Sequence, residues 1–320
     1  MDIRRIRLVP VVTAATPTPG ARDLTAARRV VVLGDSITYA GGWVEFVEAW
    51  LRLAFPDSEV EFLNLGLPSE TASGMSEPGH AGGTFPRPDV HERLARVLAE
   101  TQPDLILACY GMNDGIYFPF HEERFLKFQD GIIRLREAAA REGVRVIHLT
   151  PPVFDPVPLG GRTLPAGRQT YPLPYGGYNE VLDRCSEWLM SRRKAGWEVV
   201  DVHGPMNRFL AEQRARDAKF LLAGDGVHAN EQGQWIIARE VLAHLGAPES
   251  LTSSETPAAL LTLDPKAPEV LTLVQERQRA LKDPWLTAVG HQRPGMPAGP
   301  PLADAERTAA AITTQLKALR

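Results

Sequence analysis

A serine directly follows an apolar run near the start of the chain. The run Arg29–Leu33 is rich in valine and has no polar alternation, which is typical of a strand buried on both faces. Gly34-Asp35-Ser36 comes next, followed by an amphipathic pattern that predicts a helix over Trp43–Phe55. We therefore expect Ser36 at the carboxyl end of a parallel strand, where open α/β folds bind their ligands. Serine alone is a weak nucleophile, so chemistry here needs a base, an acid that orients the base, and donors for an oxyanion.

A histidine and an aspartate that could supply the base and the acid lie far along the chain. Asp225-Gly226-Val227-His228 comes just before a helix predicted near Glu231–Leu245. An imidazole exchanges protons near neutral pH, so His228 could take the proton of Ser36 and return it to a leaving alcohol. Asp225, three residues earlier, can fold back to hold the imidazole in one tautomer and stabilise the imidazolium.

The elements that must position these residues alternate between strand and helix. Five apolar runs predict strands: Arg29–Leu33, Val60–Leu65, Leu105–Tyr110, Val144–Leu149 and Glu198–Val202. Helical patterns lie around Trp43–Phe55, Asp89–Glu100, Glu122–Arg141, Tyr178–Lys194 and Glu231–Leu245. Such alternation implies right-handed crossovers and a parallel sheet covered on both faces. The predicted fold class is α/β, a three-layer α/β/α sandwich around a five-stranded parallel sheet.

Four short motifs lie at strand ends or in a late loop, and together they carry a resemblance to a known family. They are Gly34-Asp35-Ser36-Ile37-Thr38, Asn64-Leu65-Gly66, Gly111-Met112-Asn113-Asp114 and Asp225-Gly226-Val227-His228. In this order the chain resembles the SGNH hydrolases, also called GDSL esterases and lipases, over residues 28–246. The resemblance implies a flavodoxin-like sheet and hydrolysis of carboxylic esters through an acyl-enzyme.

The resemblance also implies a role for each matching residue. Ser36, His228 and Asp225 would be the nucleophile, base and orienting acid. The oxyanion would be bound by the backbone N–H groups of Ser36 and Gly66 and by the side-chain amide of Asn113. One departure is Ala229, which stands where the family commonly has a proline after its histidine. It removes no chemical group.

Each of these residues also has a purely structural interpretation. Ser36 could cap the following helix, and His228 could cap the helix after it. Gly66 could simply end a strand, and Asn113 could be a turn residue that bonds its own backbone. Asp35 and Asp114 are expected to be structural, accepting hydrogen bonds from loop backbone near the site.

Composition excludes several classes of function. The 320 residues carry a formal charge of −4 without a basic stripe, so no nucleic-acid partner is expected. The two cysteines, Cys109 and Cys185, form no disulfide framework and are expected to be buried thiols. The remaining histidines show no ligand spacing, so neither a metal nor another cofactor is expected. No run approaches the roughly 20 apolar residues of a membrane span, so membrane insertion is not expected.

Two segments flank the predicted hydrolase domain at 28–246. In the N-terminal segment, 1–27, arginines precede a short apolar stretch broken by Pro10, which resembles a shortened export signal. We favour no cleaved signal and a cytoplasmic location, with export left open. The segment 247–320 holds a polar linker, a helical pattern from Val270 to Leu281, a Pro/Gly-rich stretch over Pro284–Pro301 and a last helix. It could cover the active-site mouth, pack on a neighbouring subunit, or patch the outer layer of the sheet; the oligomeric state is left open.

The loops after the strands favour a small acyl group on a polar substrate. They bring together aromatic residues with a few charges, a mixture that suits a sugar ring better than a lipid chain. The interpretation is a serine esterase for short-chain, acetyl-type esters, on small molecules or glycans. A lipase or lysophospholipase-type acyl hydrolase is one alternative, and an inactive carbohydrate-binding module on the same fold is another. A dinucleotide-binding domain is disfavoured, since the first βα turn lacks Gly-x-Gly-x-x-Gly.

Overall fold

The five predicted strands form one parallel sheet. The computed structural model describes residues 27–319, so all but the last residue of the predicted N-terminal segment 1–27 lies outside it. The strands are β1 (Arg29–Gly34), β2 (Glu61–Asn64), β3 (Leu105–Cys109), β4 (Arg145–Leu149) and β5 (Glu198–Val200). Their order in the sheet is β2-β1-β3-β4-β5, and every pairing is parallel. Both the strand number and the parallel arrangement confirm the prediction.

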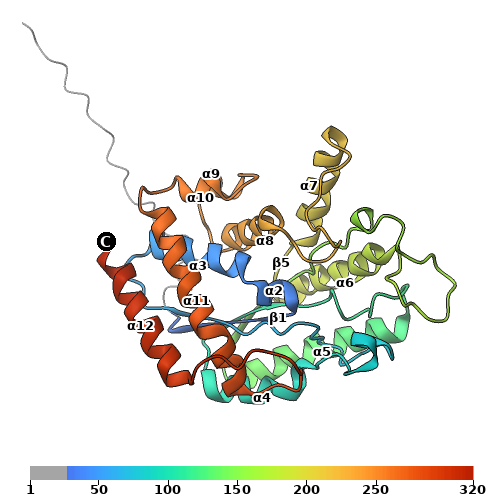
Figure 1. Cartoon of the computed structure of the whole chain (residues 1–320), viewed down its shortest axis with the longest axis horizontal. Helices are drawn as coiled ribbons and strands as arrows, with labels where there is room; N and C mark the ends of the chain where they lie inside the picture. The colour runs from blue at the N-terminus through green and yellow to red at the C-terminus, as the bar shows by residue number, and fades with distance from the viewer. Residues whose placement is uncertain (1–26, 320) are drawn as a thin grey trace, which may run out of the picture.

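Helices cover both faces of this sheet. As far as His244 they are α2 (Ser36–Ala40), α3 (Gly42–Ala54), α4 (Val90–Thr101), α5 (Glu122–Arg141), α6 (Tyr178–Arg192), α7 (His203–Arg216) and α8 (Glu231–His244). Short 3₁₀ turns occupy His80–Gly83, Val157–Leu159 and Arg193–Ala195. α3, α7 and α8 lie over one face, whereas α4 and α5 lie over the other (Figure 1).

Successive residues of β1 show why the strand is continuously apolar. Val30 and Val32 belong to the core under α3 and α8, whereas Val31 and Leu33 belong to the core under α4 and α5. All four side chains are fully buried. Because side chains alternate along a strand, burial on both faces requires an apolar residue at every position.

Four helices follow α8 as far as residue 319, and one of them, α11 (Ala267–Val289), packs on the edge of the sheet at β2. The others are α9 (Glu249–Thr252), α10 (Ala258–Leu261) and α12 (Leu302–Ala318), and Figure 1 shows α11 and α12 side by side. Arg277 and Gln278 of α11 donate hydrogen bonds to the carbonyl of Phe62 in β2. Part of the unpaired edge of β2 is thereby satisfied by side chains of α11.

Two features differ from the sequence-based expectation. α7 and the short helices α2, α9 and α10 were not predicted, and α9 lies where the polar linker was expected. α11 continues through Pro284 to Val289, although the Pro/Gly-rich stretch was expected to begin at that proline. Trp285, Leu286 and Val289 are buried after the proline, and their burial offsets the hydrogen bond that a proline removes.

A bilayer-spanning helix is not found anywhere in residues 27–319, since none of the helices there is both long and apolar enough.

Candidate active site

A tight turn places Ser36 at the carboxyl end of β1. Gly34 has no room for a side chain, since a Cβ there would lie 2.3 Å from Oγ1 of Thr38 and 2.8 Å from the carbonyl oxygen of Cys109. Asp35 caps α2 by accepting a 2.9 Å hydrogen bond from the N–H of Ile37. The cap of this helix is therefore Asp35, and the hydroxyl of Ser36, the first residue of α2, is free for another partner.

That partner is His228. Nε2 of His228 lies 2.8 Å from Oγ of Ser36, and Nδ1 lies 2.6 Å from Oδ2 of Asp225. A carboxylate only accepts hydrogen bonds, so Nδ1 carries the ring proton and Nε2 accepts from the hydroxyl. The side chains of Ser36, His228 and Asp225 are thus joined in a row by two hydrogen bonds, although Ser36 lies far from the other two in the sequence.

The carboxylate of Asp225 is held ionised by its neighbours. Partial burial opposes its charge, but hydrogen bonds from the His228 side chain and from the N–H groups of His228 and Val227 outweigh burial. The pKa of Asp225 therefore lies below its ordinary value. The negative charge next to Nδ1 holds the ring proton of His228 on that nitrogen, which leaves Nε2 as the acceptor that faces Ser36.

Backbone contacts hold the loop that carries Asp225 and His228 in place. Gly226 has φ +80° and its carbonyl accepts from the N–H of Asp155, 2.9 Å away, in the loop after β4. An isolated antiparallel bridge joins Ala223 to Ala229, the residue that departs from the family pattern. Asn230, rather than His228, caps α8 by accepting from the N–H of Gly233.

Asn113 reaches the same edge of the sheet from the neighbouring strand. β1 and β3 are paired with Gly34 opposite Cys109, so the loops after them begin side by side. The side chain of Asn113 is buried and donates from Nδ2 to the carbonyl of Glu70 at 3.1 Å. The Asn113 amide thus bonds the backbone of another loop, whereas a turn residue would bond its own backbone.

The N–H of Gly66, by contrast, already has an acceptor. It donates to Oδ1 of Asn64 at 3.0 Å, and Nδ2 of Asn64 donates to the carbonyl of Thr38 at 2.7 Å. A Cβ at Gly66 would lie 2.5 Å from the backbone nitrogen of Tyr39, so the glycine permits a close approach to α2. Gly66 could bind an oxyanion only after leaving Asn64.

A residue that the sequence analysis did not single out lies three positions further on. Ser69 has φ +70° in a turn closed by the Glu70 N–H to Leu67 carbonyl hydrogen bond. Pro68 precedes it, which matches a type II turn with a non-glycine at the left-handed position. Leu67 bonds Gly34 and Glu70 bonds Asn113, so the turn lies between the Ser36 loop and Asn113. Among residues 27–319 the N–H of Ser69 has no acceptor.

Two buried carboxylates support these loops. Asp114 accepts from the N–H groups of Ala72 and Ser73, and burial raises its pKa to about 6. Burial also raises the pKa of Asp35 to about 7, to which the nearby charge of Asp114 adds. Both residues bond backbone N–H groups near the site, Asp114 in a loop and Asp35 in the first turn of α2, which is a structural role.

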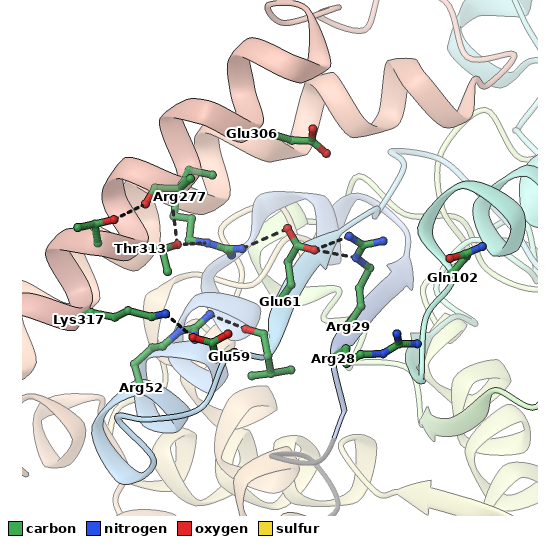
Figure 2. A pocket seen from close by; sticks show the side chains of 14 residues that line it. Arg28, Arg29, Arg52, Glu59, Glu61, Gln102, Arg277, Glu306, Thr313 and Lys317 are labelled. Atoms are coloured by element: carbon green, nitrogen blue, oxygen red, sulfur yellow. Dashed lines mark hydrogen bonds and ion pairs between the residues drawn. The ribbon is translucent and has the colours of Figure 1, made fainter.

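The row itself is open to solvent. The side chains of His228 and Asp225 are 52% and 55% exposed. A cavity of about 610 Å³ lies at the opposite, amino-terminal end of the strands, between α12 and the starts of β1 and β2. Figure 2 shows three ion pairs among its lining residues: Arg29 and Arg277 each pair with Glu61, and Lys317 pairs with Glu59. These charges join the C-terminal helices to the sheet and are remote from Ser36.

The part of the chain that the structure describes contains no group of three or more His, Cys, Asp or Glu side chains arranged to hold a metal ion.

The family can now be assigned. The model of the GDSL-like lipase/acylhydrolase family matches residues 32–236, a range that includes Ser36, Asn113, Asp225 and His228. The chain belongs to this family. Membership confirms the resemblance, the α/β fold and the class of enzyme, a carboxylic ester hydrolase. No curated protein matches the chain.

Solved structures of similar fold include two named as acetylxylan esterases. A catalytic mutant of Axe2 from Geobacillus stearothermophilus aligns with TM-score 0.51 and 18% identity, over 69% of this chain and 95% of that one. The acetyl xylan esterase AlAXEase aligns with TM-score 0.51 and 16% identity, over 67% and 98%. A gut microbial diltiazem-metabolizing enzyme matches at 22% identity and TM-score 0.49, with only 47% of its length covered. At these identities the similarity concerns the fold.

Proposed function

We propose that this GDSL-family hydrolase is a serine esterase in which Ser36, His228 and Asp225 form the catalytic triad. The observation that carries the proposal is the row of two hydrogen bonds, 2.8 Å from Ser36 to His228 and 2.6 Å from His228 to Asp225. Both lengths lie within the range across which a proton can be transferred between a nucleophile, its base and an orienting acid.

The steps follow from this geometry. Oγ of Ser36 attacks the ester carbonyl while its proton moves to Nε2 of His228, and Asp225 stabilises the imidazolium. The tetrahedral intermediate collapses, the alcohol leaves with the proton from His228, and the acyl group remains on Ser36. Water then attacks the acyl carbon, giving its proton to His228. The bond between Oγ and the acyl carbon then breaks, Oγ of Ser36 takes the proton back from His228, and the carboxylic acid leaves.

For the oxyanion we propose three donors: the backbone N–H of Ser36, the backbone N–H of Ser69 and an amide N–H of Asn113. Ser69 replaces Gly66 in this assignment because Asn64 holds the N–H of Gly66. A test is Asn64→Ala, which frees Gly66 but also loosens its hold on Thr38 in α2. We expect turnover to fall; a gain in kcat would return the role to Gly66.

We further propose an acetyl or similarly short acyl group on a carbohydrate as substrate. The half-exposed triad accommodates a bulky alcohol portion, whereas a long acyl chain would require a continuous apolar groove. Half-buried aromatic residues lie on the loops after β3 and β4, among them the contacting pair Phe118 and Tyr171. Flat rings of this kind stack on sugars, and the two similar folds named above are acetylxylan esterases.

The test compares purified wild type with Ser36→Ala on p-nitrophenyl acetate, longer p-nitrophenyl esters and acetylated xylooligosaccharides. We expect the wild type to prefer acetyl esters and Ser36→Ala to lose turnover at an unchanged melting temperature. Ser253→Ala, an exposed serine on the C-terminal segment, is the matched control. A fluorophosphonate probe should label the wild type and Ser253→Ala only.

Three outcomes would contradict the proposal in whole or in part. Retained turnover in Ser36→Ala would remove Ser36 from the mechanism. Absence of both hydrolysis and labelling in the wild type, together with measurable glycan binding, would favour the inactive binding module. A preference for long acyl chains would leave the triad in place and overturn the proposed substrate.

A further inference from the structure

Asn113 can serve an oxyanion in only one of its two orientations. A side-chain amide has a donor end and an acceptor end of nearly the same shape, so a rotation of 180° exchanges them. With Nδ2 toward the reacting carbonyl, an N–H stabilises the developing negative charge. With Oδ1 there, the carbonyl dipole would oppose that charge. Something must therefore fix the amide.

Arg87 makes the contact that fixes it. Nη1 of Arg87 lies 2.9 Å from Oδ1 of Asn113, and the hydroxyl of Tyr117 lies 3.2 Å from the same atom. A guanidinium has donors only, so the Asn113 atom that faces it must be the oxygen. The carbonyl of Glu70 only accepts, so the atom facing it must be Nδ2. The second N–H of this amide has no acceptor among the described residues.

Arg87 is itself held rigidly. Its Nε and Nη2 both donate to Glu77 at 2.7 Å, a bidentate pair, and its guanidinium lies 5.3 Å from the ring centroid of Tyr117. The side chain is only 7% exposed. Burial opposes its charge, but the hydrogen bonds to Glu77 outweigh this, and the pKa of Arg87 remains above its ordinary value. The cation is therefore permanent, and its donors cannot be exchanged for acceptors by pH.

From these contacts we propose that Arg87 is a positioning residue for ester hydrolysis, holding the amide of Asn113 so that an N–H faces the oxyanion. The proposal rests on the esterase function proposed above. Arg87 itself need not touch the substrate, since it acts through Asn113. Its removal should lower the rate of the chemical step and leave ground-state binding nearly unchanged.

The test is a double-mutant cycle between Arg87→Met and Asn113→Ala, measured on p-nitrophenyl acetate. Loss of one oxyanion donor costs about 10²–10³-fold in kcat, and we expect Arg87→Met to lose about 10–100-fold with KM within about twofold. Because Arg87 acts through Asn113, the double variant should match Asn113→Ala alone. Arg134→Met, on the exposed side of α5, is the matched control and should keep full activity.

Arg87→Lys covers the case in which Arg87→Met does not fold. Lysine retains a donor for Asn113 but loses the bidentate pair with Glu77, so partial rescue of kcat is expected. Equal activity of Arg87→Met and wild type, or losses that simply multiply in the double variant, would overturn the positioning role. Failure of the esterase proposal is distinguishable, because the wild type itself would then neither hydrolyse the ester nor react with a fluorophosphonate.

Discussion

The phenol of Tyr39 donates a 2.8 Å hydrogen bond to Oδ1 of Asp283, which ties the helix that begins at Ser36 to α11. Lys282 strengthens the link: its Nζ donates to the carbonyl of Tyr39 at 2.8 Å and lies 4.0 Å from the centroid of the phenol ring. α11 lies beyond the residues that the family model matches. The C-terminal extension therefore contacts the turn that carries the proposed nucleophile.

Replacing Tyr39 by phenylalanine should reveal what this link contributes. The variant keeps the ring and its contact with Lys282 but removes the hydrogen bond to Asp283, worth about 1 kcal/mol. We expect the free energy of unfolding to fall by about that amount and kcat to fall by less than about tenfold, with KM unchanged. Asp283→Asn, which retains an acceptor, should show a smaller loss. Identical unfolding curves and kcat for Tyr39→Phe and wild type would show that the link does not stabilise α2.

Gly226→Ala should disturb the position of His228. A Cβ there would lie 2.2 Å from the carbonyl oxygen of Asp155, and the residue has φ +80°, so the loop must move. A displacement of about 1 Å can cost about 100-fold in rate, and we expect a loss of that order in kcat. Gly224→Ala is the matched control, because its Cβ would meet nothing within 4 Å. Equal kcat values for the two variants would show that the Asp155 contact does not position the loop.

Asp35→Asn should change how stability depends on pH. Burial raises the pKa of Asp35 to about 7 from an ordinary value of 3.8. Between these values the folded chain holds a proton that the unfolded chain has released, so the free energy of unfolding falls as pH rises. Each pKa unit corresponds to about 1.4 kcal/mol. Asparagine also caps helices, so the hydrogen bond from Ile37 can be kept while the titration is removed.

The measurement is denaturant unfolding of wild type and Asp35→Asn at intervals from pH 4 to pH 8. The difference in stability should shift in favour of the variant as pH rises towards 7 and level off above it. Asp130→Asn, an exposed carboxylate on α5, serves as control and should show no such trend. A constant difference between Asp35→Asn and wild type across the range would mean that Asp35 does not titrate there.

The sheet could be predicted because its strands are buried on both faces. The valines of β1 leave no other interpretation for that run, and the predicted strand differs from the observed one by a single residue. α7 lacked such a signal: Pro205 stands in its first turn, and few of its 14 residues are apolar. α11 continues past Pro284 because Trp285, Leu286 and Val289 are buried against other elements. Such long-range contacts cannot be predicted from the local sequence pattern.

Some residues of the candidate site could likewise be predicted from the sequence, and others could not. Ser36, Asp225 and His228 could be singled out because short motifs place Ser36 at a strand end and the other two in the loop before α8, and the structure brings their side chains together. Arg87 carries no such motif: its contact with Asn113 spans 26 residues and exists only after the loop before α4 has folded. Ser69 left a weak signal, a residue after proline in a turn, which the nearby glycine of the Asn64-Leu65-Gly66 motif obscured.

The buried carboxylate of Glu48 provides the last prediction. Its side chain is fully buried in α3, and it accepts hydrogen bonds from Arg52 and from Arg277 and Gln278 of α11. Arg277→Met removes one cation from this buried charge, and removing a partner of a buried pair costs about 3 kcal/mol. We expect denaturant unfolding to show a loss of that size, whereas Arg279→Met, on the exposed side of α11, should stay within about 0.5 kcal/mol of wild type. Equal stability of the two variants would mean that Arg52 and Gln278 suffice for Glu48, and that the C-terminal extension does not anchor α3 through this charge.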